Sequence, residues 1–232
     1  MRMNGWQGTI AGILCMGVII GCASIPIRHY YEMNYLPASH WSRLNPSPYP
    51  CTIRVADFDI EQAYNRPEIV YRQSPFQLQY YYYRVWAVKP ARMVTDLIYK
   101  HLIMAELASH AVRRYDESPK PDYNLTGNIE AIEEYDSGEL WFAHLAITMN
   151  LSRISDGSPI YTRRFDLRKR VYQHTPEYVI REMSSLMEYI MTQVIRDLDG
   201  KFAKEYNPRS LPADSSVVSP DKANNGSTGE IK

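Results

Sequence analysis

The sequence has 232 residues with 26 basic and 26 acidic side chains, so its formal net charge is zero. A chain without a basic field is a poor candidate for nucleic-acid binding. Hydrophobic residues make up 45%, which allows one packed core and is too little for a protein with several membrane spans.

The start of the chain has the pattern of a bacterial lipoprotein signal. A single arginine precedes an uncharged, apolar run over residues 9–20, and residues 19–22 (Ile-Ile-Gly-Cys) fit a lipobox. The run is too short for a transmembrane helix and has the length of a signal-peptide core. We therefore expect removal of residues 1–21 and acylation of Cys22, which would anchor the chain through membrane lipids. Ala23 follows, and by the enterobacterial sorting rule it favours the outer membrane, with the domain facing the periplasm.

Cysteine usage indicates a fold without disulfides. Cys15 lies in the signal segment and Cys22 would carry the anchor, which leaves Cys51 without a partner. We expect Cys51 to be a buried, small apolar residue.

The first elements are strands separated by a loop. A short strand is expected within residues 24–35, a proline-rich connector over 36–50 and a strand over 53–60. The segment 64–86 predicts a strand pair, because its β-branched and aromatic residues are interrupted by Ser74-Pro75.

Two groups in this strand pair are candidates for partner binding. Four consecutive tyrosines should alternate, two inward and two outward: Tyr80, Tyr81, Tyr82 and Tyr83. The outward rings would be ordinary surface or an aromatic patch that meets a partner or lipid. Three arginines flank the tyrosines and would either pair with acids such as Glu68 or jointly contact an acidic partner: Arg66, Arg72 and Arg84.

A first helix is expected over residues 90–108. Pro90 can open it, since the first helical N–H needs no partner inside the helix. Apolar residues then recur at spacings of three and four: Val94, Leu97, Ile98, Leu102 and Ala105.

The second half predicts four strands and a second helix. The strands are expected over 111–115, 123–135, 140–153 and 160–171, with turns at residues 136–138 and 156–157. Thr175 and Pro176 begin the helix, and Gly200 falls near its end. Its apolar stripe consists of Val179, Met183, Leu186, Met187, Ile190, Val194 and Leu198.

This order predicts an α+β fold: a mostly antiparallel sheet with two amphipathic helices packed on one face. We divide the chain into a signal peptide (1–21), a lipidated N-terminus with the first strand and a proline-rich connector (22–50), one domain (51–206) and a disordered tail (207–232).

No catalytic, metal-binding or cofactor-binding motif is present in the sequence. Only His101 and His110 share a neighbourhood, and zinc needs three or four convergent ligands. The acidic cluster Glu130, Glu133, Glu134 and Asp136 stands beside a turn and is expected to be a solvated hairpin end.

The strand pair also carries a family resemblance. Residues 66–72 (Arg-Pro-Glu-Ile-Val-Tyr-Arg), followed by Trp86-Ala87 ahead of a helix, are similar to the pattern R-P-x-I-V-x-R … R-W-A-x-P of the ABC-type transport auxiliary lipoproteins. That family includes the paraquat-inducible protein C-like lipoproteins of MCE transport systems. Val88-Lys89 intervene before Pro90, where the family usually has an acidic residue and proline.

The resemblance implies a non-enzymatic, membrane-anchored subunit that links periplasmic lipid-transport machinery to the outer membrane. Its implied partners are an MCE-domain protein and an ABC permease and ATPase complex; a homo-oligomer is compatible with this role. The resemblance also implies a structural motif with Ile69 and Trp86 buried: Pro67, Ile69, Trp86 and Pro90. Two alternatives are a periplasmic carrier of lipid or hydrophobic ligand, and a structural cell-envelope lipoprotein outside transport.

Overall fold

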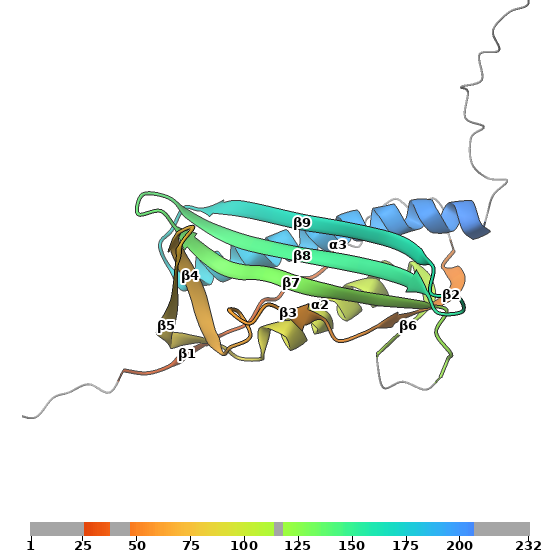
Figure 1. Ribbon diagram of the computed structural model, residues 1–232, viewed down its shortest axis with the longest axis horizontal. Coiled ribbons are helices and arrows are strands. Elements are labelled where there is room, and N and C mark those ends of the chain that lie inside the picture. The colour runs from red at the N-terminus through yellow and green to blue at the C-terminus, as the bar shows by residue number, and fades with distance from the viewer. Residues whose placement is uncertain (1–25, 38–46, 114–117, 207–232) are drawn as a thin grey trace, which may run out of the picture.

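The computed structural model describes residues 26–37, 47–113 and 118–206, and its elements confirm an α+β fold (Figure 1). In chain order they are β1 (His29–Tyr31), β2 (Tyr49–Val55), β3 (Asp59–Ile60), β4 (Glu68–Ser74), β5 (Gln77–Trp86), α2 (Pro90–Ala105), β6 (Ala108–Arg113), β7 (Tyr123–Asp136), β8 (Trp141–Arg153), β9 (Pro159–Val171) and α3 (Pro176–Tyr206). The predicted lipidation site, Cys22, and the predicted tail after residue 206 lie outside the described residues.

The sheet is mixed, and its long ladders are antiparallel. Strands β7, β8 and β9 form a meander that is paired along almost its whole length. The other side of β7 is shared by three short parallel strands, β2 at its start, β3 in its middle and β4 at its end. Strand β5 pairs antiparallel with β4, and β1 and β6 extend the sheet in parallel pairs.

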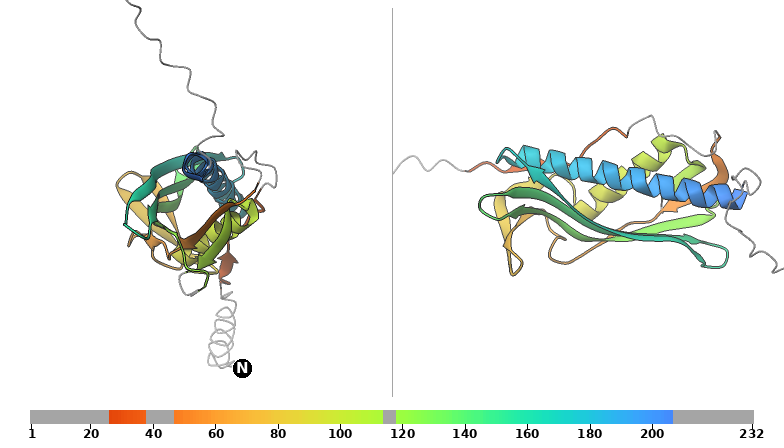
Figure 2. Two further views of the ribbon diagram at one scale, coloured as in Figure 1. Left: turned by 90° about the vertical axis from the view of Figure 1, so that its right-hand side faces the viewer. Right: turned by 90° about the horizontal axis from the view of Figure 1, so that it is seen from above.

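Both helices cover one face of this sheet, as predicted. In Figure 1 they lie behind the meander, and a view along the long axis shows the sheet curling around them (Figure 2). Alternate residues of β8 face the helices and are buried: Ala143, Leu145, Ile147, Met149 and Leu151. The predicted apolar stripes of both helices are buried against them. The core is therefore built by the period-two and helical patterns that the sequence shows.

The segment 53–60 is two strands and not one. Strand β2 ends at Val55 and β3 begins at Asp59, and between them Phe58 turns into the core. The Phe58 N–H donates to the Thr95 hydroxyl of α2 at 3.1 Å. A Cβ at Gly127 would lie 2.2 Å from the Phe58 ring and 2.4 Å from the Thr148 carbonyl oxygen, so this close approach requires glycine.

Helix α3 continues past Gly200 and ends at Tyr206, so Gly200 lies near its end, as predicted. Phe202 is buried beyond the glycine and its ring centroid lies 5.5 Å from that of Tyr49 and 5.1 Å from that of Tyr123. Burial of a phenylalanine contributes about 1.5–3 kcal/mol, whereas glycine inside a helix costs about 1 kcal/mol relative to alanine. The free energy gained by packing Phe202 therefore exceeds the cost of Gly200 in the helix.

The N-terminal segment is docked into the fold by β1 and the residues after it. Met33 is buried, and the Asn34 N–H donates to the Ser184 hydroxyl of α3 at 3.1 Å. Cys51 is buried and free, as predicted, and burial raises the pKa of its thiol to about 12. None of the helices in the described residues is long and apolar enough to span a membrane.

Candidate partner-binding surface

The hairpin β4–β5 contains an irregularity that places the tyrosines. Glu68 pairs with Val85 and Val70 pairs with Tyr80, so four residues of β5, Tyr81 to Arg84, stand opposite the single residue Ile69 of β4. Such a bulge breaks the regular alternation of side chains. Tyr82 and Tyr83, neighbours in sequence, consequently touch edge to face, with ring centroids 4.9 Å apart.

The prediction of two inward and two outward tyrosines is therefore wrong. Tyr80, Tyr82 and Tyr83 are 41%, 70% and 39% exposed, and only Tyr81 is half-buried. The Tyr81 ring stacks on Tyr71 at a centroid distance of 4.4 Å. Three aromatic side chains thus remain on the outside of the bulge.

Two of the three candidate arginines lie over rings of the tyrosine run, one over an exposed ring and one over the half-buried Tyr81. The guanidinium carbon of Arg66 is 3.6 Å from the centroid of the Tyr80 ring, and that of Arg84 is 4.3 Å from the centroid of the Tyr81 ring. One buried N–H group on each, Nε of Arg66 and Nη1 of Arg84, has no hydrogen-bond partner among the described residues. We call these two arginines together with Tyr80, Tyr82 and Tyr83 the tyrosine surface.

The third arginine, Arg72, points into a buried polar cluster on the outer face of the sheet. Its Nε donates to the carboxylate of Glu133 at 2.8 Å, and the Tyr64 hydroxyl donates to the same carboxylate at 2.6 Å. His144 lies 2.9 Å from Glu133 through Nδ1 and 2.9 Å from Asp166 through Nε2. These residues line an open hollow of about 400 Å³. We call these five residues the buried polar cluster, because Glu133, His144 and Tyr64 are buried, while Asp166 at its edge is exposed.

The acidic cluster is therefore not a solvated hairpin end, because Glu133 and Glu134 are each only 1% exposed. Burial alone would raise the pKa of Glu133, but hydrogen bonds from His144, Arg72 and Tyr64 outweigh it and hold that pKa below its usual range. Glu134 points to the opposite face, where it accepts a hydrogen bond from the Tyr81 hydroxyl at 2.7 Å. Burial raises the pKa of Glu134 to about 7 against the lowering effects of Tyr81 and Arg84.

The predicted structural motif closes the base of the hairpin. Ile69 and Trp86 are 2% and 4% exposed. The Trp86 N–H donates to the Pro67 carbonyl at 2.7 Å, and the Ala87 N–H donates to the Tyr31 carbonyl of β1 at 2.8 Å. Pro90 is buried as the first residue of α2. The motif thus joins β1, the hairpin and α2.

Comparison with known proteins places this chain in a family. Residues 36–195 match the family model described as ABC-type transport auxiliary lipoprotein component. The chain belongs to this family.

Solved structures show the fold of this auxiliary lipoprotein elsewhere. A DUF330 protein from Xanthomonas campestris matches with a TM-score of 0.63 and 20% identity, over 76% of this chain and 99% of that chain. A structure of an uncharacterized protein matches with a TM-score of 0.59 and 12% identity, over 74% and 99% of the two chains. No curated protein matches the sequence.

The tyrosine surface and the buried polar cluster are the two candidate sites in the described part of the chain. The described residues contain no group of three metal-ligating side chains that could hold an ion. In the buried polar cluster the His144 imidazole is hydrogen-bonded to the carboxylates of Glu133 and Asp166, and Arg72 binds Glu133. These contacts join β4, β7, β8 and β9.

Sequence reasoning missed this cluster, although a signal for it exists. The turn after Asp136 sets the β7–β8 register, and counting back from the pair Asp136–Trp141 places Glu133 opposite His144.

Proposed function

We propose that this auxiliary lipoprotein is a non-enzymatic subunit of an MCE-type ABC transport system, anchored at Cys22 and linking periplasmic lipid-transport machinery to the outer membrane. Family membership supports a role beside an ABC transporter. The tyrosine surface supports a docking role, since its three tyrosines are exposed and tyrosine and arginine are enriched where proteins bind one another.

The chemistry of the tyrosine surface suits a partner with acidic groups. The rings of Tyr80, Tyr82 and Tyr83 supply rigid contact area at a small entropic cost. Arg66 and Arg84 each keep an N–H group without a partner among the described residues. Both N–H groups are buried, so the two guanidiniums would attract carboxylates of an MCE-domain protein through their positive charge.

The anchor would hold this surface close to the membrane. Six residues separate Cys22 from His29, the first residue of β1, and a fully extended chain rises at most about 3.6 Å per residue. Strand β1 pairs with the end of β5 that follows the tyrosines. His29 would therefore lie within about 25 Å of the anchored Cys22, and the end of β5 beside it would lie close to the bilayer.

The decisive experiment measures binding of the full-length lipoprotein to an MCE-domain protein from the same organism. Tyr82→Ala with Tyr83→Ala should weaken binding at least about tenfold, as loss of interface anchors typically does. The matched control is Tyr172→Ala with Tyr189→Ala, two tyrosines that are 81% and 54% exposed and lie outside β5. Equal binding by both double variants, or no binding by the wild type, would overturn the proposal.

The alternative role as a carrier has less support. A carrier needs an apolar cavity between the helices and the sheet, and this space is filled by the side chains of one continuous core. The role of a structural envelope lipoprotein outside transport predicts that genes for an ABC ATPase, a permease and an MCE protein are absent from the neighbourhood of its gene.

A further inference from the structure

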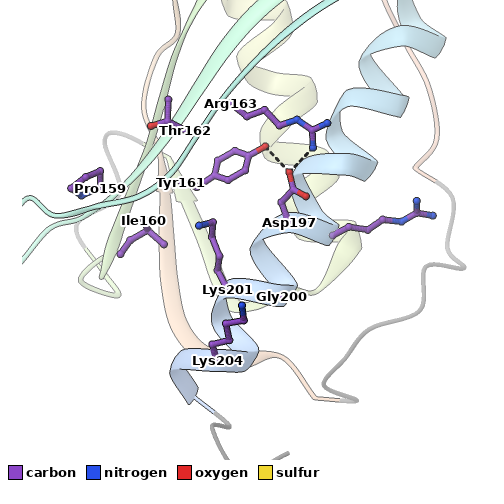
Figure 3. A pocket seen from close by; sticks show the side chains of 10 residues that line it. Pro159, Ile160, Tyr161, Thr162, Arg163, Asp197, Gly200, Lys201 and Lys204 are labelled. Atoms are coloured by element: carbon purple, nitrogen blue, oxygen red, sulfur yellow. Dashed lines mark hydrogen bonds and ion pairs between the residues drawn. The ribbon is translucent and has the colours of Figure 1, made fainter. Parts of the chain in front are cut away.

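A basic groove lies between the edge strand β9 and the last turns of α3 (Figure 3). Its volume is about 620 Å³. Residues 159–163 of β9 form one wall, and α3 forms the other with Arg196, Asp197, Gly200, Lys201 and Lys204. The side chains of Lys201 and Lys204 extend from α3 into the space that faces β9.

The charges in the groove are unbalanced. Four cations and one carboxylate line it. The carboxylate, Asp197, is already engaged, because it accepts hydrogen bonds from Arg163 at 2.7 Å and from the Tyr161 hydroxyl at 3.2 Å. Arg196, Lys201 and Lys204 are exposed and make no ion pair within the described part of the chain. The groove therefore presents an excess of three positive charges.

Gly200 is a second, independent feature of the groove. It lies inside α3, where glycine is less favourable than any residue except proline. Close packing does not explain it, because a Cβ at this position would meet no atom within 4 Å. The missing side chain leaves open the floor of the groove between Asp197 and Lys201.

We propose that this groove binds a phosphate group. Lys201 and Lys204 are three residues apart, so they stand on one face of the helix and can converge on a single oxyanion. Arg196 lies five residues before Lys201, about 140° around the helix, so it adds positive charge to the groove without joining this pair. A compact set of donors suits one multivalent anion better than an extended acidic peptide, which needs cations spaced along its length.

The groove is separate from the tyrosine surface. Glu177, at the start of α3, accepts a hydrogen bond from Tyr31 of β1 at 3.4 Å, and Asp197 follows 20 residues later (197 − 177). At a rise of about 1.5 Å per residue, the groove lies about 30 Å along α3 from the β1 end. The phosphate would therefore come from a lipid headgroup handled away from the anchor or from a free phosphate compound.

Calorimetric titration of the full-length lipoprotein in neutral detergent tests this site. Inorganic phosphate and dihexanoyl phosphatidic acid are the probes, at low salt because salt screens exposed charges. We expect both to bind, and we expect Lys201→Gln with Lys204→Gln to weaken binding at least about tenfold. The control, Lys89→Gln with Lys100→Gln, removes the same charge from exposed positions outside the groove and should bind like the wild type.

Substitutions of Gly200 change the shape of the groove without changing its charge. Gly200→Leu should fill the groove and abolish binding without lowering the melting temperature, whereas Gly200→Ala should keep binding and raise the melting temperature. Tighter binding of phosphatidic acid than of phosphate would identify a lipid headgroup, and equal binding a free phosphate compound.

Three results would overturn the phosphate site. The first is that the Lys201/Lys204 and Lys89/Lys100 double variants weaken probe binding equally. The second is that neither phosphate nor phosphatidic acid gives a heat of binding. The third is that the protein binds hexaglutamate and neither phosphate probe. Since the titration uses no partner protein, its outcome is independent of docking to an MCE-domain protein.

Discussion

Glu133 and Glu134 are adjacent and equally buried, but their surroundings shift their pKa values in opposite directions. Glu133 lies on the outer face of the sheet, where an arginine, a tyrosine and a histidine keep its pKa low. Glu134 lies on the helix face with one hydrogen bond from Tyr81, and burial dominates its pKa. Successive residues of a strand point to opposite faces of the sheet, so two adjacent carboxylates lie in different environments.

The raised pKa of Glu134, about 7, makes stability fall as pH rises. In the unfolded chain this carboxyl ionises near its usual pKa of about 4.3, so between the two pKa values only the folded state holds the proton. We expect Glu134→Gln to stabilise the protein at pH 8 by up to roughly 3 kcal/mol and to change little at pH 4.5. Urea denaturation of both proteins at the two pH values measures this, and a gap that does not grow with pH would contradict it.

Trp86 should be a stability residue, because it is buried at the junction of β1, the hairpin and α2. We expect Trp86→Ala to cost about 3–5 kcal/mol, as large-to-small changes in a core do. Tyr82→Ala, in the same strand and 70% exposed, should cost less than about 1 kcal/mol. Thermal melts compare the two. If Trp86→Ala melts like the wild type but loses the MCE-domain protein, the roles of the tryptophan and the tyrosines are reversed.

Among the helices and strands, the sequence predicts correctly those whose hydrophobic residues keep a single periodicity along their whole length. The strict alternation in residues 143–151 and the apolar stripes of α2 and α3 define their own buried faces. The turn residues at 136–138 and 156–157 then fix the antiparallel meander, where Gly138 and Gly157 adopt positive φ angles of 88° and 71°.

The errors occur where pairing between distant strands decides the outcome. The tyrosine run does not alternate, because the pairing of β4 with β5 leaves four residues opposite Ile69. The acidic cluster is buried, because Arg72 and His144 arrive from two other strands. Neither contact follows from local periodicity, so the tyrosine surface was predicted only in part and the buried polar cluster was missed.

Strand β1 is the shortest element that the core depends on, apart from β3. Its extension buries Met33, whose N–H lies 3.2 Å from the sulfur of Met93 in α2. We expect Met33→Ala to destabilise the domain by about 2–5 kcal/mol. Met104→Ala, at a position 45% exposed on α2, is the control and should stay within about 0.5 kcal/mol of the wild type in chemical denaturation. Equal melts of the two variants would mean that the N-terminal segment is not docked.

On the scale of the whole molecule, stability should come from one continuous core alone. The core joins both helices and the sheet, and the one described cysteine is buried and free. We expect a chain of residues 23–206 to fold cooperatively and to keep its melting temperature in excess chelator and in reductant. A loss of structure on adding chelator would reveal a structural metal.

The location of the whole molecule should depend on Cys22. We expect Cys22→Ser to accumulate with its signal peptide attached or to leave the outer-membrane fraction, because acylation is the predicted anchor. Cys51→Ser is the matched control and should fractionate like the wild type. Normal maturation and fractionation of the Cys22 variant would contradict a lipoprotein.

The parallel pairing of β1 with β5 has a mechanical consequence. In a chain anchored at Cys22 and bound to a transporter, any tension between the two membranes enters the fold through β1. This strand is held by three residue pairs, whereas the β7–β8 ladder runs from Tyr123 to Asp136. Weakly paired peripheral elements open at a lower free energy than central ones. Under load β1 would therefore peel away first, lengthening the tether while the meander and the basic groove keep their shape.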